Sequence, residues 1–177
     1  PTLFLIYIND LLSITDSQIH SYADDSTPHT TALPGRNNVI NYVPAASSLT
    51  TDLSKIIQWG KANLVEFNTS KTHQLLISHR HDIDDFPYIF MGDDNVDNET
   101  SLSMLGVTLD SKLSWKKHIS SISISAARKL GFLFRAKGYF TPSQLLTLYK
   151  SQIRPVLEYC SHIWAGAPVN SLRLLDS

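Results

Sequence analysis

The stretch QIHSYADDSTPHT, residues 18–30, contains two short runs that suit β-strands, Gln18–Tyr22 and Ser26–Thr30. Between them stand Ala23, Asp24 and Asp25. Two β-compatible runs that flank a short polar segment are typical of a β-hairpin. The sequence therefore predicts a hairpin that carries two adjacent carboxylates at its tip.

Helix and strand patterns alternate around this hairpin within residues 1–110. Before it, apolar residues at helical spacing from Leu3 to Leu11 predict a helix that ends near Leu12. After it, a second helical period runs from Leu49 to Leu64. Short β-compatible runs follow at residues 73–78, 88–91 and 102–109. This part of the chain is therefore predicted to be α+β.

Residues 111–177 differ from the first 110 in charge and in pattern. Residues 1–110 hold 5 Lys/Arg and 14 Asp/Glu, a balance of −9, whereas residues 111–177 hold 10 and 2, a balance of +8. An apolar stripe from Ile119 to Leu133 predicts one helix, a capping box at Thr141–Gln144 predicts a second, and Pro155 is expected to begin a third. A boundary is predicted near residues 110–115, which divides the chain into 1–110 and 111–177.

Composition narrows the class of protein. The 177 residues are 42% hydrophobic and 18% charged, which suits a packed core and argues against wholesale disorder. No apolar run approaches the roughly 20 residues of a membrane-spanning helix, and residues 3–8 lack the flanks of a signal peptide. The single cysteine, Cys160, excludes an internal disulfide. We therefore expect an intracellular protein of the nucleus or cytoplasm, without membrane contact.

The carboxylate pair at the predicted hairpin tip suits a metal site. Phosphoryl transfer relies on metal ions that neutralise charge on the attacking and leaving oxygens, and Mg²⁺ prefers carboxylate ligands. Neighbouring side chains of an extended chain point to opposite faces, so we expect one of Asp24 and Asp25 to dominate. The alternative is an ordinary acidic turn, since the chain also contains Asp84-Asp85 and Asp93-Asp94.

A series of motifs in order along the chain resembles non-LTR retrotransposon reverse transcriptases of the LINE type, in particular jockey-like elements. Tyr22-Ala23-Asp24-Asp25 looks like their signature aspartate pair, and residues 3–11 look like the segment that follows the Gln-Gly motif in these polymerases. The other matching segments are Trp59 with Asn63 and Phe67-Asn68, Ser70-Lys71-Thr72, Leu105–Asp110, Ser114–Ile119, Leu148–Lys150, Arg154–Cys160 and Trp164.

The resemblance implies RNA-directed DNA polymerisation by a two-metal mechanism with Mg²⁺. It implies that residues 1–110 form a partial palm and residues 111–177 a helical thumb. Asp24 and Asp25 would serve as catalytic metal ligands, and Lys71 as general acid for the pyrophosphate leaving group. Tyr22, Leu105 and Gly106 would contact the primer. The basic residues that would follow the nucleic-acid backbone are Lys112, Lys116, Lys117, Arg128, Lys129, Arg135 and Lys137.

The family's active site also contains an aspartate, a fingers region and a Gln-Gly segment that would precede Pro1. We therefore expect the remainder of a polyprotein upstream and little activity from this chain alone. The implied partners are an RNA template, a DNA primer and deoxynucleoside triphosphates. Two alternatives remain from the sequence, a non-catalytic remnant that binds nucleic acid through its basic helices, and a decayed element without function.

Overall fold

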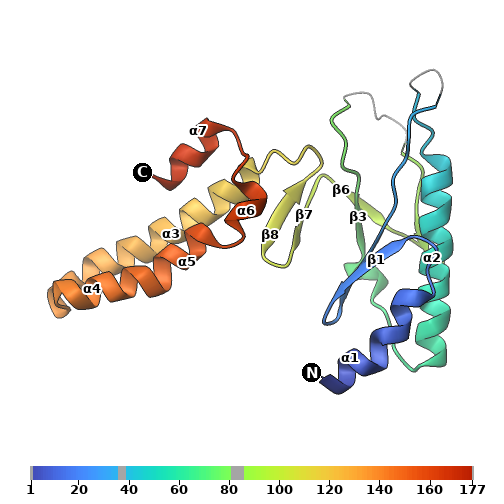
Figure 1. Cartoon of the computed structure of the whole chain (residues 1–177), viewed down its shortest axis with the longest axis horizontal. Helices are drawn as coiled ribbons and strands as arrows, with labels where there is room; N and C mark the ends of the chain where they lie inside the picture. The colour runs from blue at the N-terminus through green and yellow to red at the C-terminus, as the bar shows by residue number, and fades with distance from the viewer. Residues whose placement is uncertain (1, 36–38, 81–85, 177) are drawn as a thin grey trace. The chain divides into compact units, whose positions relative to one another are not determined.

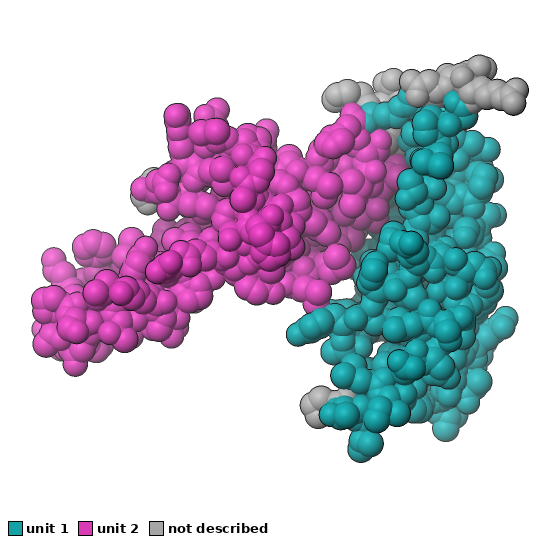
Figure 2. Space-filling model, in the orientation of Figure 1, with its two compact units in different colours: residues 1–74, 80–98 teal, residues 75–79, 99–177 magenta. Residues whose placement is uncertain are grey.

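The structure is a computed structural model that describes residues 2–35, 39–80 and 86–176 (Figure 1). The chain divides into two compact units, which Figure 2 colours separately. Unit 1 consists of Pro1–Gln74 and Arg80–Asn98, and unit 2 of Leu75–His79 and Glu99–Ser177. Each unit has its own hydrophobic core, so each can be described by itself.

Unit 1 combines a long helix with short antiparallel strand pairs. β1 pairs with β2, β4 pairs with β5, and β3 pairs with β6. The boundary between the two units falls within β3 and within β6. The elements are α1 (Thr2–Ile8), a 3₁₀ turn (Asn9–Ser13), β1 (Gln18–Tyr22), β2 (Asp25–His29), α2 (Val43–Ala62), a second 3₁₀ turn (Thr69–Lys71), β3 (His73–Leu75), β4 (Phe90–Met91), β5 (Asp94–Asn95) and β6 (Asp97–Glu99).

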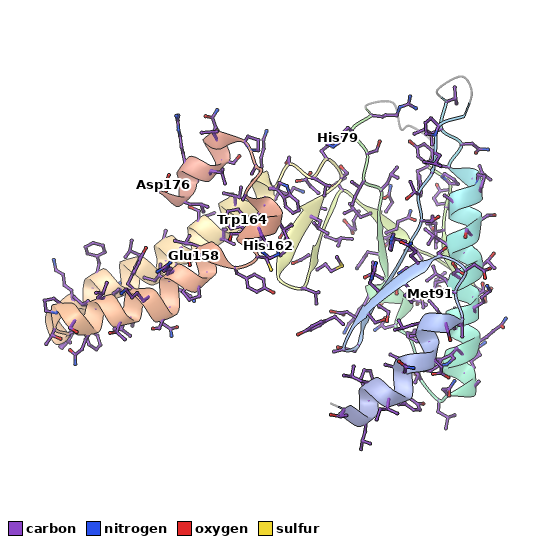
Figure 3. All side chains as sticks on the ribbon, viewed as in Figure 1. His79, Met91, Glu158, His162, Trp164 and Asp176 are labelled. Carbon is purple, nitrogen blue, oxygen red and sulfur yellow. The ribbon has the colours of Figure 1, made fainter. Side chains whose placement is uncertain are left out.

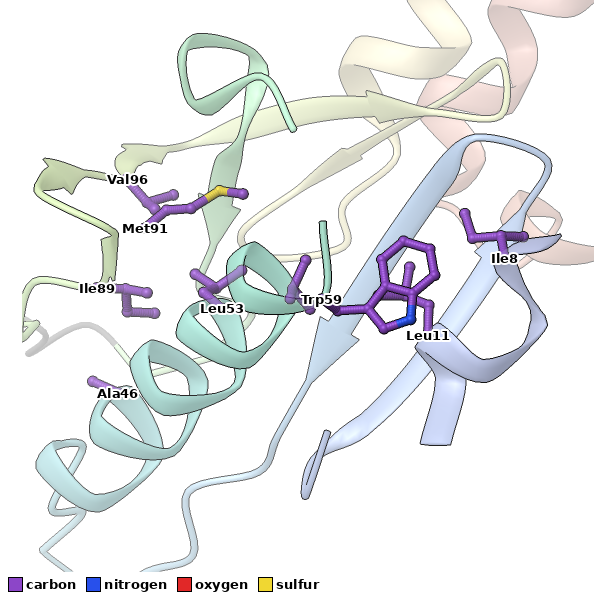
Figure 4. Packing of buried hydrophobic residues seen from close by; sticks show 9 residues of the cluster. Ile8, Leu11, Ala46, Leu53, Trp59, Ile89, Met91 and Val96 are labelled. Atoms are coloured by element: carbon purple, nitrogen blue, oxygen red, sulfur yellow. The ribbon is translucent and has the colours of Figure 1, made fainter. Parts of the chain in front are cut away.

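The core of unit 1 is built on one face of α2 (Figure 4). Ala46, Leu53, Ile56 and Trp59 recur at helical spacing on that face and are buried. Ile8 and Leu11, from the α1 end of the chain, and Ile89, Met91 and Val96, from the β4–β5 region, close over them. Full burial of a large apolar side chain contributes about 1.5–3 kcal/mol, so this face fixes α2 in the unit.

Unit 2 places one hairpin beside a set of helices. β7 pairs with β8, and α3 packs against α5 and the π-helical segment before it. Ile119, Trp164 and Ala167 form the buried core, and Figure 3 labels Trp164 on α6. The elements are β7 (Ser101–Met104), β8 (Val107–Asp110), α3 (Lys116–Ala136), a 3₁₀ turn (Lys137–Tyr139), α4 (Pro142–Leu148), a π-helical segment (Tyr149–Ile153), α5 (Arg154–Glu158), α6 (Ser161–Trp164), α7 (Val169–Leu172) and a last 3₁₀ turn (Arg173–Leu175).

The broad α+β prediction is confirmed, and several of its elements are present. The 18–30 hairpin forms, the first helix is followed by a 3₁₀ turn that ends at Ser13, and the capping box at Thr141 forms with Gln144. The long helix begins earlier than predicted, at Val43. The predicted strands 73–78 and 88–91 shorten to β3 and β4.

One predicted strand is wrong, and the helix predicted at Pro155 is confirmed. Residues 102–109 are not one strand but part of the β7–β8 hairpin, because Leu105 and Gly106 take the positive φ angles of a tight turn. Pro155 stands in the first turn of α5, as predicted, and the π-helical segment joins this helix directly to α4. Proline lacks an N–H, and the wider π-helical turn that precedes it accommodates this loss without a break.

The compact units divide between Asn98 and Glu99 rather than near residue 110. β8 packs against α3, so the hairpin joins the helical unit even though its sequence belongs to the acidic half. The assignment of residues 1–110 to a palm and 111–177 to a thumb stays a prediction. Within the described ranges, no helix combines the length and the apolar character needed to cross a lipid bilayer.

Candidate functional site

The hairpin β1–β2 presents the predicted carboxylates at a tight turn. Its strands pair in register from Gln18 with His29 to Tyr22 with Asp25. Ala23 and Asp24 therefore form a two-residue turn, and Asp25 is the first residue of β2. Ala23 takes a φ of 55°, in the left-handed region that residues other than glycine rarely occupy. The predicted bend is present at the predicted residues.

Both carboxylates are open to solvent. Asp24 and Asp25 are exposed, and the Tyr22 side chain is 69% exposed. Carboxylate oxygens are the ligand type that Mg²⁺ prefers, so the pair fits this ion in chemistry. Among the residues that the structure describes, no group of three or more His, Cys, Asp or Glu is arranged to hold a metal ion. Asp24 and Asp25 could therefore supply only part of an octahedral shell.

The turn between β4 and β5 repeats this geometry elsewhere in unit 1. Met91 pairs with Asp94, which leaves Gly92 and Asp93 as the two turn residues. Gly92 takes a φ of 69°, so the turn places a positive φ and then an aspartate where β1–β2 has Ala23 and Asp24. Turn geometry alone thus does not separate the two aspartate pairs. The third pair, Asp84-Asp85, lies outside the described residues.

Two features do distinguish the β1–β2 tip. Its strands are five residues long, whereas β4 and β5 have two residues each, so Asp24 lies at the end of a longer hairpin. Its positive φ falls on alanine, which lacks the conformational freedom of Gly92. Backbone strain of this kind concentrates at functional sites, which favours Asp24 over Asp93 as a site residue.

A buried carboxylate that sequence reasoning missed lies at the base of the same hairpin. Asp52 of α2 is fully buried. Its Oδ1 accepts the backbone N–H of Asp16 at 2.8 Å, and its Oδ2 accepts that of Ser17 at 2.9 Å. Lys55 Nζ lies 2.7 Å from Asp16 Oδ2 and 3.6 Å from Asp52 Oδ1.

The hydrogen bonds to Asp52 explain why its carboxylate stays ionised although it is buried. Burial by itself raises the pKa of a carboxyl group. Here hydrogen bonds from Ser17 and Asp16, with the charge of Lys55, outweigh burial and lower the pKa of Asp52 below 3.8. The sequence did contain a signal, because Asp52 falls within the apolar helical stripe that Leu49, Leu53 and Ile56 define.

Lys71 ends the 3₁₀ turn Thr69–Lys71 and is exposed. It belongs to unit 1, as do Tyr22, Asp24 and Asp25, whereas Leu105 and Gly106 belong to unit 2. It lies in a short turn between α2 and β3. Its role as a general acid stays a prediction.

Leu105 and Gly106 form the tip of the hairpin β7–β8. Their φ angles are 49° and 79°, the pattern of a type I′ turn, in which both central residues have positive φ. Tyr159, just after α5, donates its hydroxyl to the Leu105 carbonyl oxygen at 2.9 Å. A Cβ atom at position 106 would lie 3.3 Å from Tyr159 Cε1, so glycine suits both the turn and the close ring.

A buried histidine fastens the second strand of that hairpin to α3. His118 Nδ1 accepts the Thr108 N–H at 3.2 Å, and the side chain is 2% exposed. Its ring centre lies 6.1 Å from that of Trp164. Burial lowers the pKa of His118 below 6.5, since the charged form is disfavoured away from water. Sequence analysis had assigned no role to this residue.

The basic residues of α3 do not all face the same way. Lys116, Lys117 and Arg128 line an open groove of about 780 Å³ together with Ser120, Ser121, Ile124 and Ser125. Lys117 also donates to Ser101 Oγ at 2.8 Å, whereas Lys129 lies outside this lining and donates to the Gln152 carbonyl oxygen at 3.1 Å. The groove therefore gathers three of the seven predicted nucleic-acid contacts, with hydroxyl groups between the charges.

The remaining predicted contacts lie beside α3. Lys112 lies in the turn that follows β8. The side chain of Asp110 stabilises this turn, because its Oδ1 accepts the backbone N–H groups of Lys112 and Ser114, each at 3.0 Å. Burial tends to raise the pKa of Asp110, but these bonds and the Ser114 hydroxyl lower it below 3.8. Arg135 ends α3, and Lys137 begins the next 3₁₀ turn. Residues 111–157 contain no aspartate or glutamate, so no acidic side chain of this segment offsets its charge.

Comparison with known proteins agrees with these motifs. The RNA-directed DNA polymerase from the mobile element jockey of Drosophila melanogaster is 25% identical over 191 aligned residues. Its Drosophila funebris counterpart is 24% identical over the same length. Both alignments cover the whole of this chain and 20% of the relative. The chain resembles a jockey-type reverse transcriptase from end to end.

The resemblance that the motifs indicated is thus confirmed at low identity, and the chain spans about one fifth of the length of these jockey relatives. No family model matches the sequence, and no solved structure matches the chain significantly. The roles of individual residues therefore rest on the motifs and on the geometry described above.

Proposed function

We propose that this chain carries part of the catalytic centre and nucleic-acid track of a jockey-type RNA-directed DNA polymerase. The observation that supports this most is the exposed Asp24-Asp25 pair at a strained two-residue turn, within a chain similar to jockey polymerase along its whole length. The reaction would extend a DNA primer along an RNA template with deoxynucleoside triphosphates.

In this proposal Asp24 is the principal metal ligand and Asp25 supports it. Mg²⁺ bound there would neutralise charge on the oxygens of the transferred phosphoryl group. Asp24 lies in the turn itself, whereas Asp25 begins a strand and shares a cross-strand pair with Tyr22. Tyr22 is exposed beside the carboxylates and would contact the primer end. Lys71 would donate a proton to the pyrophosphate leaving group.

The test uses a longer polypeptide that joins this chain to the upstream part of the polymerase. Asp24→Asn is expected to abolish primer extension, because it removes a charged metal ligand without changing its size. Asp93→Asn is the matched control, since Asp93 occupies the equivalent turn position in β4–β5 and should leave extension unchanged. Equal loss from both variants, or none from Asp24→Asn, would overturn the proposal.

Two further variants refine the roles in the same assay. Lys71→Ala should slow extension by about 10²-fold if the ammonium acts as a general acid. A rate unchanged by Lys71→Ala would remove that role from the proposal. The chain alone, with two carboxylates at the site, is expected to give no extension, and Asp24-dependent extension from it would contradict this.

The basic groove on α3 favours a second candidate function, nucleic-acid binding without catalysis. Phosphate contacts by lysine and arginine release counterions, so affinity should fall steeply with salt. The chain should shift an RNA–DNA duplex in gels at low salt, and Lys116→Gln with Arg128→Gln should weaken binding and flatten the salt dependence. Lys129→Gln is the control, because its ammonium donates to Gln152. Binding that ignores salt would exclude this function.

A further inference from the structure

Among the residues that the structure describes, few side chains of the hairpin β1–β2 are buried. Along β1 only Ile19 is partly buried, and it packs against the core cluster. In β2 only Ser26 and Pro28 are partly buried. The turn residues Ala23 and Asp24 are exposed. The direction of the hairpin is therefore set mainly at its base, where β1 begins.

That base is where the buried Asp52 binds the chain. Asp16 and Ser17 immediately precede Gln18, the first residue of β1. Both donate their backbone N–H groups to the two oxygens of the Asp52 carboxylate. A carboxylate that accepts two adjacent N–H groups fixes the orientation of that peptide segment as well as its distance from the helix.

The surroundings of Asp52 hold the carboxylate in one position. Asp52 is fully buried on α2, a 20-residue helix anchored by the core of unit 1. Lys55, one turn later on α2, joins Asp16 and Asp52 through its ammonium. The Ser17 hydroxyl lies 3.2 Å from that of Ser48, also on α2. Three polar side chains of one rigid helix thus converge on two residues at the root of the hairpin.

A small change in the orientation of the hairpin at its base produces a larger displacement at its turn. Tyr22, the last strand residue before the turn, lies four residues beyond Gln18, which is roughly 13 Å at about 3.3 Å per residue. A tilt of about 5° at the root would then move the tip by about 1 Å. Misplacement of a reacting group by about 1 Å can slow catalysis by about 10²-fold. The accuracy of the tip therefore depends on how firmly its root is held.

We propose that Asp52 is a positioning residue for the Asp24-Asp25 site, which it aims by clamping the backbone of Asp16 and Ser17 to α2. This inference rests on the proposed function for its catalytic consequence, but the clamp itself does not. Asp52 stays remote from the reacting atoms and acts only through the hairpin. The clamp uses both carboxylate oxygens, so a neutral amide of the same size can accept only one of the two bonds.

The first experiment measures the clamp in the chain itself by amide hydrogen exchange. In Asp52→Asn, exchange of the β1–β2 amides should rise at least about 10-fold, while amides near Trp59 in α2 keep their protection. Ser17→Ala, which removes one hydroxyl donor and no charge, should give a smaller rise. Thr51→Ala, an exposed neighbour on the same helix, is the control and should change neither region. Unchanged hairpin exchange in Asp52→Asn and Ser17→Ala would overturn the proposal.

The second experiment measures the catalytic consequence in the longer polypeptide, below its unfolding temperature. Asp52→Asn should lower kcat for primer extension by more than about 10-fold. Ser17→Ala should lower it by less than about 10-fold. The KM for the nucleotide should change little in either variant. A purely structural role would lower the folded fraction and leave kcat per folded molecule intact, which would overturn the inference. Activity that survives Asp24→Asn would instead overturn the proposed function, and the exchange result would still decide whether the clamp exists.

Discussion

The hairpins β1–β2 and β7–β8 are held in opposite ways. β1–β2 is fastened at its root, by Asp52, and its tip stands exposed. β7–β8 is fastened at its tip, where Tyr159 bonds the Leu105 carbonyl, and along its second strand, where His118 bonds Thr108. A tip that binds an outside ion or substrate needs open space, whereas a tip bonded to a helix can only present a fixed backbone surface.

The groups that hold the two hairpins also differ in charge. Asp52 keeps its negative charge in the folded protein, because hydrogen bonds and Lys55 offset the effect of burial. His118 Nε2 has no hydrogen-bond partner among the described residues, and burial favours the neutral form of the ring. The two units should therefore respond differently to substitution and to acid, and the following predictions use that difference.

The largest effect is expected from His118→Ala in unit 2. This change removes a buried ring that contacts Trp164 and leaves the Thr108 N–H without its acceptor. Loss of a buried side chain and a buried hydrogen bond together should destabilise unit 2 by about 2–4 kcal/mol. Hydrogen exchange resolved by unit would measure this, with Lys116→Ala on the exposed side of α3 as the control. A change below about 0.5 kcal/mol, or equal loss in both units, would contradict the comparison.

A smaller effect is expected from mild acid. The folded pKa of His118 is below its unfolded value of about 6.5, so the unfolded chain binds the extra proton first. The contribution of neutral His118 to the free energy of unfolding of unit 2 is complete above about pH 6.5, and it is lost as the pH falls towards the pKa of His118 in the folded state. One proton limits the slope to about 1.4 kcal/mol per pH unit.

Unit 1 should respond to acid in a lower range. The folded pKa of Asp52 is also lowered, so its contribution is complete above about 3.8 and is lost only below that pH. Denaturant unfolding between pH 7 and pH 5 should therefore weaken unit 2 and leave unit 1 unchanged. His118→Leu should abolish the slope in unit 2. A slope that persists in His118→Leu would assign the effect to another group.

Sequence patterns predicted the β1–β2 turn, which depends on neighbouring residues, but missed the hydrogen bonds between residues far apart in the chain. The β1–β2 turn follows from residues 18–30 alone, because strand propensity and a polar turn occur together there. The clamp joins residues 36 and 35 positions apart, and the bond from Tyr159 to Leu105 spans 54 positions. Such contacts depend on tertiary packing, which no short window of sequence reports. Asp52 could have been noticed as a charge within an apolar stripe, but its partners could not.

The error in the predicted strand at residues 102–109 has a physical cause. Residues 102–109 have the apolar content of a strand, yet Leu105 and Gly106 adopt positive φ and reverse the chain. A leucine in the left-handed region is unfavourable by itself, and the bond from Tyr159 to its carbonyl helps to stabilise that conformation. At this turn the tertiary structure outweighs local preference.

A third prediction concerns the bonded tip. Tyr159→Phe removes only the hydroxyl group, so the ring still packs against Gly106. The Leu105 carbonyl then loses a hydrogen bond worth about 0.5–1.5 kcal/mol, and exchange of the β7–β8 amides should rise accordingly. The exposed Tyr139, changed to phenylalanine, is the control. Protection that stays the same in Tyr159→Phe would mean that the turn needs no fastening.

The smallest effect is expected at the open tip. Ala23 holds a φ of 55°, which costs alanine about 1 kcal/mol and glycine almost nothing. Glycine also gains freedom in the unfolded chain, by a similar amount, so Ala23→Gly should change the free energy of unfolding by less than about 0.5 kcal/mol. In the longer polypeptide, however, a more flexible turn should hold Asp24 less firmly and lower kcat.

The matched change at the other aspartate turn is Gly92→Ala in β4–β5. It places alanine at a φ of 69° with a Cβ 3.4 Å from Ile57 Cδ1, so it should destabilise unit 1 by about 1 kcal/mol without altering the kinetics of the folded enzyme. If Ala23→Gly lowers kcat without changing stability, and Gly92→Ala lowers stability without changing kcat, then Ala23 is a residue that stiffens the turn carrying Asp24. Identical behaviour at both turns would instead make the strain at Ala23 incidental to function.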